Sequence, residues 1–201
     1  SSLTISTNGN IHFETATASG YNNTMPNTLT PNATIAGVFS DLNMGTNVST
    51  DVWYFIKGSA PNRQFVLIVD TTNFFSGTGQ CSYQIIIKEG SNEIEIHTGL
   101  MTQTTSNKVQ GIENATGTLG LVIPGRNNTP LWSGIPDAYK FSRGLNYVWS
   151  PTNYLNNNLI KNPLASNVQT STLYNVTVTA SNGCSSSGFT SLIVNPNANI
   201  S

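Results

Sequence analysis

The sequence predicts an all-β protein: an antiparallel β-sandwich of jelly-roll-like type, followed by a small β module. Apolar and β-branched residues recur in short bursts bounded by Gly, Asn, Pro or Ser, whereas the period of an amphipathic helix is almost absent. Turn signals with Asn or Thr beside Gly separate several bursts, as at residues 7–9, 115–117 and 181–183. A hydrophobic content of 37% is enough to fill cores in a chain of 201 residues.

The expected strands follow these bursts in order along the chain. In the first part they cover residues 3–6, 10–14, 33–38, 52–57, 64–70, 82–88, 93–98, 109–113, 118–123 and 138–142. In the second part they cover residues 147–150, 173–179 and 189–194. We expect the first core to contain the large apolar side chains Ile35, Phe65, Leu67, Tyr83, Ile85, Ile87, Ile94 and Ile96.

The alternation of apolar and polar side chains is clearest at residues 93–97. There the two isoleucines are expected to face a core, and the two glutamates and the histidine to face water. The loop at residues 89–92 contains Gly and Asn, which tolerate a positive φ, so it closes a hairpin with the preceding strand.

The pattern changes after residue 142. Strands before it are joined by short loops, whereas the Asn-rich stretch 152–162 carries no strand signal. We therefore place a domain boundary here, with a β-sandwich at residues 1–144 and a β module at residues 145–201. Three strands are fewer than a stable sandwich normally needs, so the module is expected to be incomplete.

The composition excludes two classes of partner. Only 8% of the residues are charged, against about 25% in an average domain, and the net charge is −1 with 8 basic residues. Such a surface has no basic stripe for nucleic acid. No apolar run approaches the roughly 20 residues of a transmembrane helix, so no membrane span is expected.

Glu93 and Glu95 are the pair of residues to weigh for catalysis. Two carboxylates on one strand face resemble the layout of laminarinase-like glycosidases, which need a carboxylate pair about 5 to 9 Å apart. The third acid of that pattern is missing, because His97 and Thr98 stand in its place. A solvated hairpin face explains the two glutamates equally well, and we expect no enzyme.

Other residue patterns give weaker predictions. No nucleophile elbow is present, and the two histidines, His12 and His97, are expected at the surface without further zinc ligands. Asp41, Asn43 and Asp51 surround a loop that could supply oxygen ligands to calcium, or that is simply a capped turn. No other cofactor is expected.

The two cysteines, Cys81 and Cys184, carry no metal-binding spacing. Either they are separate thiols or they form a single disulfide in an oxidising compartment.

Two tryptophans are candidates for stacking on sugar rings. Trp53 lies in the apolar run 52–56 and is expected in the core, whereas Trp132 lies in a loop and is expected to be the exposed ring. A ligand-binding role is therefore assigned to Trp132.

Several segments together resemble nidogen-like domains. The element at residues 3–13, with Thr-Asn-Gly between two strands, is followed by a polar loop and by the apolar strand and acidic turn at residues 33–43. Further segments resemble a version of this domain found in large secreted surface proteins of Bacteroidetes: residues 60–66 (APNRQFV), 83–95, 111–117 and 124–127. Residues 147–184 resemble the PKD/Ig-like repeats of the same proteins.

The resemblance implies an extracellular or cell-surface module of an adhesin or surface fibre. The chain opens directly on the Thr-Asn-Gly element and shows no leader, so we expect a piece of a longer protein. An upstream segment or a neighbouring subunit would then add a strand beside residues 3–6 or 147–150. The alternative is a carbohydrate-binding appendage of a secreted hydrolase.

Overall fold

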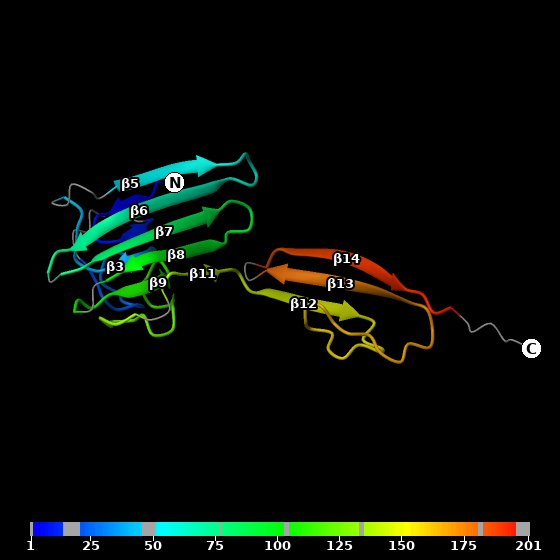
Figure 1. Cartoon of the computed structure of the whole chain (residues 1–201). Helices are drawn as coiled ribbons and strands as arrows, with labels where there is room; N and C mark the ends of the chain where they lie inside the picture. The colour runs from blue at the N-terminus through cyan, green and yellow to red at the C-terminus, as the bar shows by residue number, and fades with distance from the viewer. Residues whose placement is uncertain are drawn as a thin grey trace, which may run out of the picture. The chain divides into compact units, whose positions relative to one another are not determined.

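The computed structural model describes residues 2–13, 21–45, 51–76, 78–102, 105–132, 135–180 and 183–195. The chain divides into two compact units, residues 1–142 and 143–201. Figure 1 shows strands in both units. Within the described residues, no helix is long and apolar enough to cross a membrane.

The first unit contains two antiparallel sheets, which confirms the predicted fold class. Sheet A has the order β1 (Thr4–Ser6), β2 (Asn10–His12), β3 (Thr34–Phe39), β9 (Val109–Glu113) and β10 (Gly120–Val122). Sheet B has the order β11 (Asp137–Phe141), β8 (Ile94–Met101), β7 (Gln80–Lys88), β6 (Gln64–Phe74) and β4 (Leu42–Asn43), and β5 (Asp51–Lys57) also pairs with β6. Because β6 is long, β4 and β5 occupy different stretches of the same edge.

The core between the sheets contains the side chains that alternation predicted. Ile35, Leu67, Tyr83, Ile85 and Ile96 are all buried, and Phe65, Ile87 and Ile94 pack against them while partly exposed. Gly37 on β3 allows the close packing of the sheets, since a Cβ at this position would lie 2.3 Å from the Tyr83 ring.

His12 is completely buried, so the prediction that it lies at the surface is wrong. Residues at positions 10 and 12 of β2 pair with Ala36 and Thr34 of β3 and therefore share their face of sheet A. A second apolar cluster covers that face, formed by Met25, Ala36, Phe39 and Val109. Strands β2 and β3 of sheet A are thus covered on both faces, so a polar residue of either strand is enclosed.

Trp53 is 50% exposed, so the prediction that it belongs to the core is also wrong. All seven residues of β5 are exposed, although five of them in succession are large and apolar. The run forms a strand, as expected, but this strand lies at the edge of sheet B (Figure 1).

The second unit is one antiparallel sheet of three strands, β12 (Leu145–Ser150), β13 (Thr172–Ala180) and β14 (Ser185–Leu192). Tyr174 on β13 is buried, and its hydroxyl donates a hydrogen bond to the Asn153 carbonyl at 2.8 Å. The predicted strand at 189–194 begins earlier, at Ser185, because a run of serines carries no apolar alternation to reveal it.

Candidate interaction surface

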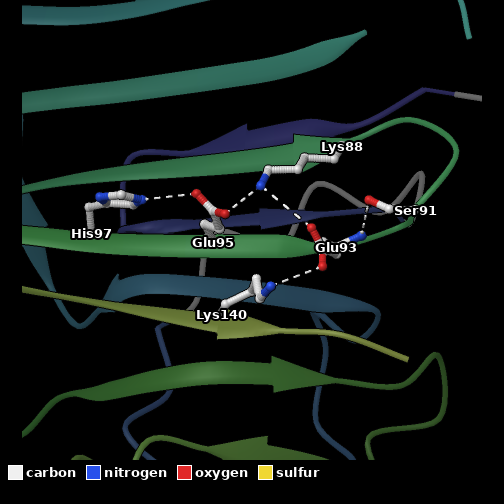
Figure 2. Close-up of polar contacts among 6 residues, drawn as sticks. All are labelled: Lys88, Ser91, Glu93, Glu95, His97 and Lys140. Atoms are coloured by element: carbon white, nitrogen blue, oxygen red, sulfur yellow. Dashed lines mark hydrogen bonds and ion pairs between the residues drawn. The ribbon is translucent and has the colours of Figure 1, made fainter. Parts of the chain in front are cut away.

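The outer face of β7 and β8 carries the two glutamates that resemble a catalytic pair (Figure 2). Lys88 on β7 donates to Glu95 at 2.5 Å and to Glu93 at 3.5 Å. Lys140 on β11 donates to Glu93 at 3.1 Å, and His97 lies 3.2 Å from Glu95. Both carboxylates therefore belong to a network of ion pairs, on the solvent-facing side that the alternation predicted.

These ion pairs hold the glutamates in the charged form. The hydrogen bond from Lys140 lowers the pKa of Glu93, and the hydrogen bond from Lys88 lowers the pKa of Glu95, each against a smaller opposing effect of desolvation. A general acid in glycoside hydrolysis needs a raised pKa instead. The arrangement supports the solvated hairpin face rather than an acid and a nucleophile.

Trp132 is partly buried, which corrects the expectation of an exposed ring. It packs against the core of the first unit. The Arg126 guanidinium lies over the ring, 4.9 Å from its centroid, and the Lys108 ammonium lies over it at 5.5 Å, so both cations contact the aromatic surface on which a sugar would stack. Binding of a ligand by Trp132 stays a prediction.

A buried polar network fixes the loop that carries Trp132. The Arg126 guanidinium donates to both carboxylate oxygens of Asp137 and to the side-chain oxygen of Gln110. It also lies over the Tyr139 ring, 5.2 Å from the ring centroid. Gln110 in turn donates to Thr98 at 2.9 Å and to the Gly37 carbonyl at 2.7 Å. Sequence reasoning missed this network because its members are far apart along the chain and follow no local motif.

Lys108 is the second buried cation in this region. Its ammonium donates to the carbonyls of Ser106, at 3.1 Å, and Pro130, at 2.6 Å, and lies 5.5 Å from the Phe74 ring. Desolvation lowers the pKa of Lys108 to about 8. The enclosed carbonyls and rings indicate a structural role, that of holding the 130–132 segment against the sandwich.

The proposed calcium ligands come from the two strands that share the edge of β6. Asp41 precedes β4, Asn43 lies in β4 and Asp51 opens β5. In the part of the chain that the structure describes, no group of three or more His, Cys, Asp or Glu side chains is placed to hold a metal ion. Calcium binding at these residues stays a prediction.

The cysteines lie in different units. Cys81 on β7 is completely buried, which raises the pKa of its thiol, whereas Cys184 before β14 is exposed. A disulfide between them stays a prediction.

An exposed apolar strand, β5, is a prominent feature of the surface. Its central side chains Val52, Trp53, Tyr54, Phe55 and Ile56 are exposed by 41%, 50%, 69%, 44% and 59%. Monomeric soluble proteins seldom expose contiguous apolar patches larger than a few hundred Å², and larger ones mark interaction sites. We call these five residues, with Asp51 and Lys57 at the ends, the β5 surface.

Both faces of β5 contribute to this surface. Val52, Tyr54 and Ile56 pair with core-facing residues of β6 and so point to the core side, whereas Trp53 and Phe55 pair with Ile68 and Val66 and point outward. No residue of β5 belongs to either core cluster of the described residues, since the cores end beneath β6. The Tyr54 ring stacks on the ring of Phe65, with centroids 6.4 Å apart.

The edge of β5 that faces away from β6 completes the surface. Among the described strands, β5 pairs with β6 alone. One row of backbone donors and acceptors is therefore directed outward, beside the exposed apolar side chains. The sequence shows the apolar run, but only the strand order shows that it is an edge.

The second unit contains a pocket of about 360 Å³. Trp149 and Tyr174 supply aromatic rings to its lining, and Lys161 and Asn162 supply polar groups. The Trp149 indole N–H donates to the Ile160 carbonyl at 3.0 Å, which fixes the ring. The volume is in the range of small-molecule sites.

Comparison with known proteins identifies the first unit. A family model described as NIDO related matches residues 1–151, more than half of the chain, and includes every strand of the first unit. The match confirms the nidogen-like part of the predicted resemblance, and the family is typically extracellular. No curated protein and no solved structure shows a significant match. The chain belongs to the NIDO-related family.

Proposed function

We propose that this chain is a non-enzymatic module of a bacterial cell-surface adhesin or surface fibre, and that it acts in adhesion or assembly through protein contacts of the β5 surface. The family indicates an extracellular-type module. The observation that carries the proposal is the exposure of five consecutive large apolar side chains on an edge strand. Such a strand favours association, because both its side chains and its backbone gain from a partner.

The wider context is part of the same proposal. The resemblance of residues 147–184 to PKD/Ig-like repeats, and of the first unit to secreted surface proteins of Bacteroidetes, supports display outside the cell. The sparse charge is compatible with contacts made by apolar and backbone groups, since only 8% of the residues are charged.

A display assay tests the adhesive role. The full chain is displayed on a non-adherent bacterium, and the cells retained on glass under flow, together with cell clumps, are counted. Replacing Trp53 and Phe55 together by Thr keeps a β-forming strand but removes the outward aromatic rings. Retention and clumping should both fall several-fold.

The matched control is Leu121→Thr on β10, which removes a side chain that is also well exposed but lies in sheet A. It should retain the adhesion of the unchanged chain. Equal adhesion of all three chains would remove the β5 surface from the proposal.

The absence of catalysis is supported by the ion pairs of Glu93 and Glu95. Hydrolysis of β-glucans is assayed with the unchanged chain and with Glu93→Gln and Glu95→Gln. We expect no turnover in any of them. Hydrolysis that either substitution abolishes would make the protein a glycosidase.

Carbohydrate binding is the second candidate function, and the pocket beside Trp149 and Tyr174 favours it. Aromatic rings with nearby amide groups suit neutral sugars. A glycan array with the unchanged chain, Trp149→Ala and Trp132→Ala separates the sites. Specific retention lost in Trp149→Ala supports binding in this pocket, loss in Trp132→Ala alone supports the loop site, and no retention leaves the adhesive module.

A further inference from the structure

We propose that the partner of the β5 surface is a second copy of this chain, which pairs with it antiparallel about a two-fold axis through Tyr54. The inference deepens the proposed function and rests on it for the choice of surface.

The choice of edge follows from the lengths of the strands. In the first unit, β5 has 7 residues, against 5 in β11, 3 in β1, 3 in β10 and 2 in β4. Natural proteins protect their edges with short strands, proline, bulges or charges. Residues 52–56 contain none of the protective residue types, so among the edge strands that the structure describes β5 presents the longest uninterrupted template.

The register follows from the order of residues along β5. Two antiparallel copies centred on Tyr54 place Trp53 opposite Phe55, and Val52 opposite Ile56, with each pair on one face of the joined sheet. The same register places Asp51 of each copy opposite Lys57 of the other. The strand is therefore complementary to its own reverse, with apolar pairs inside and an ion pair at each end, as a two-fold contact requires.

Within one chain, the charged residues at the two ends of β5 have no oppositely charged residue across from them on β6. Asp51 pairs across to Asp70 on β6, and like charges directly opposite each other are unfavourable. Lys57 pairs across to Gln64. In the part of the chain that the structure describes, neither Asp51 nor Lys57 makes an ion pair. A second copy supplies both missing counter-ions.

The apolar area is sufficient for a weak, reversible dimer. Each aromatic side chain buries about 150–250 Å² when enclosed, so the exposed parts of Trp53, Tyr54 and Phe55 represent roughly 300 Å² per copy. If both copies bury these rings together with the flanking side chains of Val52 and Ile56, the total buried area approaches that of small transient interfaces, which lies below about 1,200 Å². Tyr54 meets its own counterpart beside Phe65, which extends the existing ring pair.

Charge reversal tests the register by sedimentation of the full chain over a range of concentrations. The unchanged chain should associate reversibly to a dimer. Asp51→Lys alone and Lys57→Asp alone each create two like-charge pairs and should weaken dimerisation roughly tenfold or more. Both positions are exposed, so circular dichroism should show an unchanged fold.

A double variant and a mixture of the two single variants test whether the charges act by pairing between the two copies. The double variant Asp51→Lys/Lys57→Asp restores both end pairs and should dimerise like the unchanged chain. An equimolar mixture of the two single variants should form mixed dimers, since each carries the charges that the other needs. Failure of both rescues would overturn the register.

Cysteine cross-linking locates the two-fold axis. In a Cys184→Ser background, Tyr54→Cys places two thiols on opposite residues with Cβ atoms about 4.5–5.5 Å apart, and oxidation should give a covalent dimer. Val52→Cys is the matched control, because it should not cross-link with itself but should cross-link with Ile56→Cys. Equal cross-linking of Tyr54→Cys and Val52→Cys would contradict the axis.

The adhesive role of the β5 surface and its pairing with a second copy can be contradicted independently of each other. A chain that remains monomeric at every concentration, while adhesion still depends on Trp53 and Phe55, overturns the second copy as the partner and leaves the adhesive surface intact. A dimer with the stated charge dependence in a chain that confers no adhesion overturns the proposed function instead.

Discussion

The neighbouring strands β5 and β6 are similar in sequence and opposite in environment. Both carry continuous apolar runs, and they pair residue for residue, with Tyr54 opposite Leu67. Tyr54 is 69% exposed, whereas Leu67 has no exposed surface. The difference arises from position, because β6 lies between two strands above the core and β5 lies beyond it. An apolar run therefore predicts a strand, but the strand order decides whether it is buried.

Truncating the buried Leu67 should destabilise the chain far more than truncating its exposed partner Tyr54. Leu67→Ala should lower the free energy of unfolding by about 2–5 kcal/mol, because it leaves a cavity in the core. Tyr54→Ala should lower it by less than about 1 kcal/mol, since most of the ring is already in water. Urea denaturation of dilute protein measures both. Equal losses would mean that β5 is as well packed as β6.

The buried amino group of Lys108 should give the next largest effect, on the pH dependence of stability. The pKa of Lys108 is lowered to about 8, so between this value and its ordinary value the unfolded chain binds more protons than the folded chain. This difference stabilises the folded chain increasingly as pH rises through that range, by on the order of 1–3 kcal/mol. Relative to Lys108→Met, the unchanged chain should therefore gain stability between pH ~8 and ~10.

The unchanged chain has to be compared with Lys108→Met because two other buried groups also titrate at alkaline pH. Burial raises the pKa of Cys81 and of Tyr83, which lowers the stability of both chains as pH rises. Lys57→Met on β5 is the exposed control and should follow the unchanged chain. Parallel curves for Lys108→Met and the unchanged chain would show that Lys108 is solvated.

The smallest effect concerns the ion pairs on the outer face of sheet B. The pKa of Glu95 is lowered by Lys88 and His97, so its contribution to stability is present above the ordinary pKa and is lost as pH falls through the lowered value. Glu95→Gln should flatten the acid limb of the stability curve slightly, by less than either change above. Acid denaturation monitored by fluorescence measures it, and a raised slope would contradict the pairing.

The sequence predicted most of the fold because local patterns encode it. The alternation at residues 93–97 gave the correct faces of β8, and the Gly and Asn of the preceding hairpin loop adopt positive φ at Gly90 and Asn92. The two-residue strand β4 was missed, since Leu42 and Asn43 are too few to show a period.

The functional surface was less predictable, because exposure depends on the whole topology. The environments of Trp53 and Trp132 are the reverse of those predicted. The Trp53 ring in the apolar run is exposed, whereas the Trp132 ring in the loop is partly buried and contacts Arg126 and Lys108. His12 is buried because a loop covers the second face of sheet A. None of these long-range contacts leaves a pattern in neighbouring residues.

Hydrogen–deuterium exchange tests whether β5 is a folded edge strand that is open to a partner. Exchange is followed at residues 51–57 and 64–70 in the full chain at increasing protein concentration. We predict that 64–70 is protected throughout, and that 51–57 is weakly protected in dilute protein and gains protection as the concentration rises. Protection of 51–57 equal to that of 64–70 at the lowest concentration would contradict the account.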